Sequence, residues 1–530
     1  MPELNYDIPP LGGLKRDLPS QLLERHYSPS LNAVWPFNGR IRRMPGKKQL
    51  SSVALDTSGG VQGMYMLELD DGSAAFVACS REKAYQYNAV SGIFDSLHTS
   101  SDSGFTGGEA DLFDFAPFFD SAGTEILVLT NGVDSIKKWL GTGYIEDLGG
   151  TPDKCKYLEP YQNYLMKAGI ANAPRQLQWT DLGNGENHPV ENYIDFFKTT
   201  DIIMRPKTLR DSLVVYKSKS ISIVDYVGGD LIFRNRENYI DGHGLIGSRS
   251  VQNYGYGAEV HYYIGSDFEL HRFDLIEAPP VSKNISQILI NMEPSTWAGI
   301  CSIRTTQYDK LMWAIPGRGV AGNYDLLIYD LKTNSFWIRE GEPRRIMSMV
   351  EGREGSSTLT WDSIIADTWD EWDVPGGWDA MATEGDVSNA FIAYGCDDGI
   401  VRMMVAGLDD DGTAMESHFK YPFDNLDGSD RSLKQLKKII VETSNEGSGE
   451  VKFSLFKDNN DQNEVTLNDD GDTSATLSLT ADDANALYVY HEIDVSVIGY
   501  NFAAMLASEG AVWSGRVVKW IYEYVGNKIV

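Results

Sequence analysis

The chain has 530 residues and carries 76 Asp and Glu against 46 Lys and Arg, a formal net charge of -30. Such a surface repels nucleic acid and anionic membranes, because binding to phosphates requires clustered Lys and Arg. With 42% hydrophobic residues and 51 Gly, the composition is that of a folded, turn-rich protein. A chain of this length is expected to form two to four domains, or one large repeat-built domain with an appendage.

The sequence indicates no cofactor, and the cysteines favour a reducing compartment. Cys79, Cys155, Cys301 and Cys396 lie far apart and form no CxxC pair, which predicts neither a zinc site nor a disulfide scaffold. The opening "MPELNYDIPP" lacks the charged and apolar regions of a signal peptide. No apolar run approaches the roughly 18 residues of a membrane span. We therefore expect a protein made and used in soluble form.

Residues 1–50 read as a basic, proline-rich arm that ends in a β-hairpin. They hold eight Lys and Arg against four Asp and Glu, the reverse of the balance in the whole chain. Asn38 and Gly39 both tolerate the positive φ of a tight turn, which predicts a hairpin between "AVWPF" and "RIRRM". Alternation along the second strand then places Arg40 and Arg42 on one face and Ile41 and Arg43 on the other.

The arm has little of the apolar periodicity that would form a core of its own, so we expect it to lie against a neighbouring subunit or ring. Its basic residues would meet carboxylates there; they are Arg40, Arg42, Arg43, Lys47 and Lys48. The alternative is that "RIRRM" is an ordinary solvated strand of the same domain.

Residues 51–405 read as short apolar or alternating runs bounded by Gly, Asp and Asn, the pattern of strands joined by tight turns. Units such as "VHYYIGSDFELHRFD" and "YDLLIYDLKTNSFWIRE" have the same order of elements, namely one strand, a turn and a second strand. Four strands per blade require about 40 to 50 residues, so this region predicts an all-β propeller of about six or seven blades with little helix. A stack of β-sandwiches is the alternative.

Two motifs in this region, and the histidines of the whole chain, have simple structural interpretations. "GRGVAG" fits GxGxxG but is followed by a strand-like run, so no helix N-terminus is present to bind a pyrophosphate. Four tryptophans at 361, 369, 372 and 378 precede Asp residues without the recurrence of a WD repeat. They favour packing of one loop, with glycan binding as the alternative. The eight histidines are scattered, and neither HExxH nor GxSxG occurs.

Residues 406–530 alternate acidic loops with runs such as "GEVKFSLFK" and "GRVVKWIYEYV", which predicts a separate β-sandwich. "RSLKQLKKIIVE" has partly helical spacing, yet its β-branched end favours a strand. None of the acidic loops fits an EF-hand, so solvated turns are favoured over calcium sites. If the protein surrounds DNA, these loops are candidates for a negatively charged channel lining, namely Asp409, Asp410, Asp411, Asp469, Asp470 and Asp472.

An ordered set of motifs resembles a family of bacteriophage virion proteins with β-propeller cores. The set runs from "LGGL" and "NAVWPFNGRIRRMPG" through "LVLTNGVDSIKKWLGTGYIEDLGG", "LQWTDLGN" and "DSLVVYKSKSISIVDYVGG" to "VHYYIGSDFELHRFD". The likeness covers about residues 9 to 380. The family includes tail hub or nozzle proteins of short-tailed phages, sometimes called packaged-DNA stabilisation proteins.

The resemblance implies a structural protein of the virion tail, made in the cytoplasm of a bacterial host, and not an enzyme. It implies a ring of identical subunits, commonly six, below the portal and adaptor, through which DNA leaves the capsid without specific binding. A negative surface suits such a conduit, because it does not hold a polyanion. The alternative is a tail-associated propeller that binds or cleaves glycans, since paired carboxylates of a glycosidase meet only in the fold.

Overall fold

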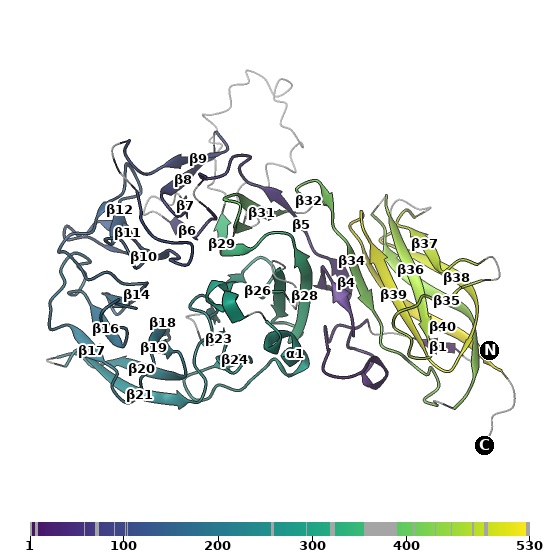
Figure 1. Cartoon of the computed structure of the whole chain (residues 1–530). Helices are drawn as coiled ribbons and strands as arrows, with labels where there is room; N and C mark the ends of the chain where they lie inside the picture. The colour runs from purple at the N-terminus through teal and green to yellow at the C-terminus, as the bar shows by residue number, and fades with distance from the viewer. Residues whose placement is uncertain are drawn as a thin grey trace.

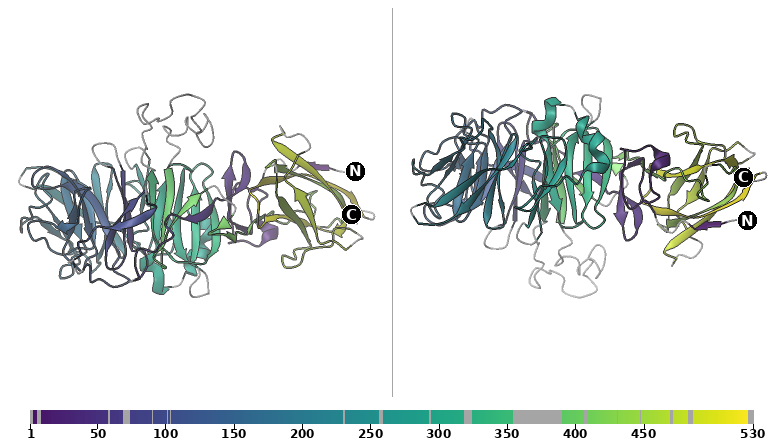
Figure 2. Two further views of the ribbon diagram at one scale, coloured as in Figure 1. Left: turned by 90° about the horizontal axis from the view of Figure 1, so that it is seen from above. Right: turned by 90° about the horizontal axis from the view of Figure 1, so that it is seen from below.

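The computed structural model describes residues 3–525 with the exceptions of 6–8, 58, 69–73, 90, 101, 103, 230, 256–258, 293, 318–323, 354–389, 406–408, 430, 447, 469–470 and 482–485. A β-propeller and a β-sandwich lie side by side (Figures 1 and 2). The helices of these ranges are the short α1 (Ser286–Ile290) and three 3-10 turns, η1 (Ser20–Leu22), η2 (Lys283–Ile285) and η3 (Pro294–Gly299). None of them is long and apolar enough to cross a membrane.

Seven antiparallel sheets form the propeller blades around a central axis (Figure 1). Numbered in chain order and each given from its inner strand outward, blade one is β6 (Gly63–Glu68), β7 (Ala74–Cys79), β8 (Ala84–Asn88) and β9 (Ile93–Ser96); blade two is β10 (Asp114–Phe119), β11 (Glu125–Thr130), β12 (Lys137–Trp139) and β13 (Glu146–Asp147); and blade three is β14 (Tyr157–Tyr161), β15 (Tyr164–Ala168), β16 (Gln176–Trp179) and β17 (Tyr193–Asp195). Blade four is β18 (Ile203–Leu209), β19 (Ser212–Lys217), β20 (Ser220–Tyr226) and β21 (Phe233–Asp241), and blade five is β22 (Gln252–Tyr254), β23 (Val260–Ile264) and β24 (Leu270–Phe273). Blade six is β25 (Cys301–Thr305), β26 (Lys310–Pro316), β27 (Tyr324–Asp330) and β28 (Ser335–Glu342), and blade seven is β29 (Ile346–Arg353), β30 (Ala390–Cys396), β31 (Val401–Val405) and β5 (Gly46–Gln49). The predicted propeller is thus confirmed, with seven blades among the described strands.

The sequence of each blade strand reflects its distance from the axis. The second strands β7, β19 and β26 read "AAFVAC", "SLVVYK" and "KLMWAIP" and are buried along almost their whole length. Neighbouring blades cover both faces of these strands, so apolar residues are needed at every position. The outer strand β21, "FRNRENYID", is mostly exposed or half-buried and is correspondingly polar.

The N-terminal segment closes the ring of blades. β5 is antiparallel to β31, with Lys48 opposite Met403, and forms the fourth strand of blade seven. The same sheet continues into β32 (Asp409–Asp410) and β33 (Thr413–Ala414). Strands from the beginning and the end of the propeller region therefore lie in one sheet, which covers the edge that β31 would otherwise expose.

The sandwich contains two sheets that also recruit N-terminal strands. One sheet has the order β3 (Val34–Phe37), β4 (Arg40–Arg43), β40 (Ser514–Tyr524), β35 (Lys434–Ser444) and β38 (Tyr488–Gly499), with β1 (Glu3–Asn5) also on β40; the other has the order β2 (Leu31–Asn32), β34 (Ser417–Lys420), β39 (Phe502–Ser508), β36 (Glu450–Lys457) and β37 (Ser474–Ser478). Trp513 stacks on Phe419 between the sheets, with ring centroids 5.7 Å apart. "RSLKQLKKIIVE" contributes to β35, the predicted strand.

The described part of residues 1–50, which the sequence suggested as a separate arm, packs within its own chain. Asn38 and Gly39 have φ of 48° and 77° in the β3–β4 hairpin, as predicted. Upstream of it, Leu14 N donates to Phe336 O of β28 at 2.7 Å, and Ser28 Oγ donates to Lys420 O of β34 at 2.7 Å. The segment therefore lies between the propeller and the sandwich and bonds to both.

The four cysteines are buried and form no disulfide, in agreement with their spacing. Burial raises the pKa of the Cys155 thiol to about 12, so the thiolate is disfavoured. These residues pack as small apolar side chains.

Candidate functional site

A buried network of charged side chains joins the N-terminal strand β5 to the last strand of blade six and to β32. The ammonium of Lys47 on β5 pairs with Glu342 at the end of β28, and the two side chains are 5% and 4% exposed. Arg339 Nε lies 2.9 Å from Glu342 Oε1, and the same guanidinium pairs with Asp410. Asp410 Oδ1 also accepts a hydrogen bond of 2.9 Å from the Lys47 backbone. We call Lys47, Arg339, Glu342 and Asp410 the junction network.

The charges of the junction network compensate one another. Burial alone would raise the pKa of Glu342, but the nearby Arg339 and Lys47 outweigh it and hold this pKa below its ordinary value. Burial lowers the pKa of Lys47, and Glu342 opposes that shift. Removing one member would leave the others buried without compensation, and that situation is strongly destabilising.

The five predicted docking residues separate into two groups. Arg40 pairs with Glu442 of β35 and lies over the Tyr488 ring, 3.3 Å from its centroid. Arg43 is buried and donates to Ala511 O at 2.8 Å. These two and Lys47 thus bind groups of their own chain.

The remaining two docking candidates lie closer to solvent. Arg42 is half-buried and lies over the Phe37 ring, and Lys48 is exposed. Docking on another subunit stays a prediction, and Arg42 and Lys48 are the residues best placed to test it.

The predicted channel-lining carboxylates lie at the outer side of blade seven and in the sandwich. Asp409 is exposed, Asp410 belongs to the junction network, and Asp411 Oδ2 pairs with Arg402 Nε at 2.5 Å. Asp472 is exposed in a turn where its carboxylate accepts from the Asn468 amide at 3.1 Å. Asp469 and Asp470 lie outside the described residues, as do the four clustered tryptophans. A role in lining a DNA channel stays a prediction.

A cavity of about 540 Å³ lies at the centre of the propeller, where all seven blades contribute to its wall. Its charged lining residues are Asp114, Glu159, Arg205, Lys207, Arg249, Arg304 and Glu351. Sequence patterns missed this group, because its members lie on six different blades and no local motif links them. The sequence signal that could have located this group is the presence of charged residues in strands that become inner strands, such as "MRPKTL" and "SIRT".

Arg249, in the wall of this cavity, connects five blades. Its guanidinium donates to Met347 O at 3.0 Å and Gln62 O at 2.8 Å, and also to Phe113 O. Its own carbonyl accepts from Ser302 Oγ at 2.5 Å. These bonds reach blades one, two, six and seven from the start of blade five, so Arg249 is primarily a structural residue.

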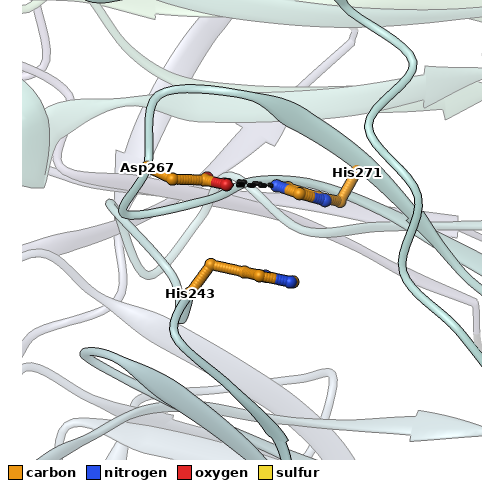
Figure 3. A group of neighbouring side chains, drawn as sticks. All are labelled: His243, Asp267 and His271. Carbon is orange, nitrogen blue, oxygen red and sulfur yellow. Dashed lines mark hydrogen bonds and ion pairs between the residues drawn. The ribbon is translucent and has the colours of Figure 1, made fainter.

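Three side chains with metal-ligating atoms meet on blade five, with these atoms within 4.8 Å of one another (Figure 3). His271 Nδ1 lies 2.8 Å from Ala278 O, and Nε2 lies 2.9 Å from Asp267 Oδ2. Both ring nitrogens of His271 therefore lie at hydrogen-bond distance from oxygen atoms. His243 stacks on His271 with centroids 4.2 Å apart and planes 6° apart. The lone pairs that ligate a metal lie in the plane of each imidazole ring, so one ion cannot lie in the planes of both stacked rings, and this arrangement does not favour a metal site.

No protein-family model matches the chain, and no curated protein matches it. Among solved structures, the chain is similar to one described as the crystal structure of BBS1N in complex with ARL6DN, soaked with lead, at 7% sequence identity and a TM-score of 0.38. The alignment covers 71% of this chain and 98% of that chain. The propeller assignment rests on the strand pairings described above.

Proposed function

We propose that this chain is a structural subunit of a bacteriophage tail, in a ring below the portal and adaptor through which DNA leaves the capsid. The proposal rests on the resemblance of an ordered set of sequence motifs to those of virion propeller proteins. The observations on the fold that best support it are the junction network, which ties β5 to blade six and to β32, and the hydrogen bonds by which the N-terminal segment joins β28 of the propeller to β34 of the sandwich. A tail ring must withstand the passage of DNA, and a subunit of tightly joined parts suits that task.

The charge distribution fits a conduit role as well. The chain carries a net charge of -30, and a carboxylate-rich wall would repel phosphates instead of holding them through counterion release. Within this proposal the protein has no catalytic role, acts in the virion tail, and contacts the adaptor and other tail proteins.

Two measurements test the proposal. Mass photometry of the purified protein, alone and mixed with its adaptor, is expected to reveal a ring, most simply a hexamer. A cryo-electron microscopy reconstruction of the virion should then place that ring below the portal with a negative bore. A protein that is absent from purified virions, or a bore lined mainly by Lys and Arg, would refute the conduit role.

Docking through the basic segment is tested with Arg42→Gln combined with Lys48→Gln. The two side chains make no ion pair with described residues, so the fold should be unchanged while ring assembly weakens. Lys219→Gln combined with Arg234→Gln is the matched control, because both residues are exposed on blade four. Equal assembly of the two double variants would exclude these residues from docking.

A further inference from the structure

We propose that the central cavity of the propeller binds a small ligand through one oxyanion group, a carboxylate or a phosphate, with Arg304 as its main partner. This inference does not depend on the ring proposal, because it concerns a cavity within a single chain. The argument starts from the distribution of charge around the wall.

The cations of the cavity lie on three consecutive blades, and the carboxylates lie on others. Arg205 and Lys207 come from β18, Arg249 precedes β22, and Arg304 lies on β25. Blades four, five and six thus contribute no carboxylate to this wall. The acidic side chains come from blades two, three and seven and are Asp114, Glu159 and Glu351. The lining therefore has four cations and three carboxylates, in a chain with the opposite overall balance.

Three of the cations have protein partners. Arg205 NH1 lies 2.7 Å from Asp114 Oδ1, and Lys207 Nζ lies 3.6 Å from Glu159 Oε2. Arg249 donates to the three carbonyls described above. The third carboxylate, Glu351, accepts from the backbone and hydroxyl of Thr306 at 2.7 and 2.8 Å. Within the described residues, Arg304 is thus the one cation of this lining that lacks both an ion pair and a hydrogen bond.

Arg304 is held in a suitable position for an anion. Its guanidinium lies over the Tyr254 ring, 5.2 Å from the centroid, and its Nε is buried without a hydrogen-bond partner. Buried N–H groups are nearly always bonded, so an orphan of this kind indicates a missing acceptor. A guanidinium that stacks on a ring keeps its in-plane donors available, and these donors match carboxylate or phosphate oxygens in pairs.

Blades one and two contribute an aromatic pair to the wall of the cavity. Tyr65 and Phe115 both line it and stack with centroids 5.7 Å apart. A cavity of about 540 Å³ with an aromatic pair in its wall and one available arginine falls in the range of small-molecule sites. The geometry therefore fits a ligand with an oxyanion at one end and a ring-sized body at the other.

Isothermal titration calorimetry of the full chain at constant ionic strength tests this site with four probes. They are glucuronate, glucose 6-phosphate, inorganic phosphate and neutral glucose. We expect glucuronate or glucose 6-phosphate to bind with one site per chain, and glucose to give no signal. The stronger of the two charged sugars identifies the oxyanion. Absence of binding by all three anions at millimolar concentration would overturn the proposal.

Variants locate the binding. Arg304→Gln should weaken the best probe at least tenfold, and Arg304→Lys should give an intermediate loss because it keeps the charge without the paired donors. Arg234→Gln, on the exposed outer strand β21, is the matched control and should bind as the unmodified protein does. If Arg304→Gln does not fold, Lys207→Gln replaces it and should weaken binding several-fold, because Glu159 then loses its cation. Unchanged affinity in Arg304→Gln, or in Lys207→Gln as its substitute, would refute the site. Equal affinity for inorganic phosphate and glucose 6-phosphate would refute the aromatic half of it.

Discussion

Lys47 and Glu342 form a buried ion pair between residues 295 positions apart in the chain. The pair connects the N-terminal strand of blade seven to the last strand of blade six. It therefore makes the closure of the propeller depend on residues that precede the propeller in the sequence.

Glu342→Gln should lower the free energy of unfolding by about 3 to 5 kcal/mol, because Lys47 would remain buried without a carboxylate and Arg339 would keep only Asp410. Urea denaturation followed by tryptophan fluorescence measures the change. Glu191→Gln, an exposed glutamate of blade three, is the control and should change stability by less than about 0.5 kcal/mol. A similar small change in Glu342→Gln would mean that the pair contributes little.

Gly46→Ala should also destabilise the closure. A Cβ at position 46 would lie 2.1 Å from the backbone oxygen of Asp409, so β5 and β32 would have to separate. Overpacking of this kind costs about 1 to 3 kcal/mol. Gly510→Ala is the control, because a Cβ there meets no atom within 4 Å. Thermal melting of the two variants side by side measures the difference, and equal melting temperatures would contradict the close approach.

Deletion of residues 1–50 should prevent cooperative folding. It removes β5 from blade seven and β1 to β4 from the sandwich, which leaves several strand edges exposed. Limited proteolysis and circular dichroism of the truncated chain measure the effect, and aggregation is the expected outcome. A truncated chain that melts like the full chain would show that these strands are dispensable.

The contribution of Glu186 to stability should depend on pH. Lys138 and Ser121 donate hydrogen bonds to its carboxylate, which lowers its pKa from 4.5 to about 2. A carboxylate with a lowered folded-state pKa stabilises the fold fully above its unfolded pKa, and that contribution disappears as the pH falls through the folded value. Glu186→Gln should therefore melt below the unmodified protein at pH 7, and the gap should narrow between pH 4.5 and pH 2. A gap that is constant over this range would contradict the lowered pKa.

The sequence by itself determined the strands and the all-β class. These features follow from local rules. Short apolar runs between Gly, Asp and Asn fix strands and turns, and the Asn38-Gly39 pair fixes a hairpin because both residues accept positive φ. The burial of Ile41 and Arg43 on one face of β4 likewise follows from strand alternation.

Only the tertiary structure decided where the basic segment lies and which charges meet. Arg40, Arg43 and Lys47 look like solvated cations in sequence, yet each finds a partner from a distant part of the same chain. The same is true of Arg304, whose place beside the central cavity depends on how seven blades close into a ring. Pairing between distant strands is set by the packing of whole sheets and not by neighbouring residues, so no local pattern records it.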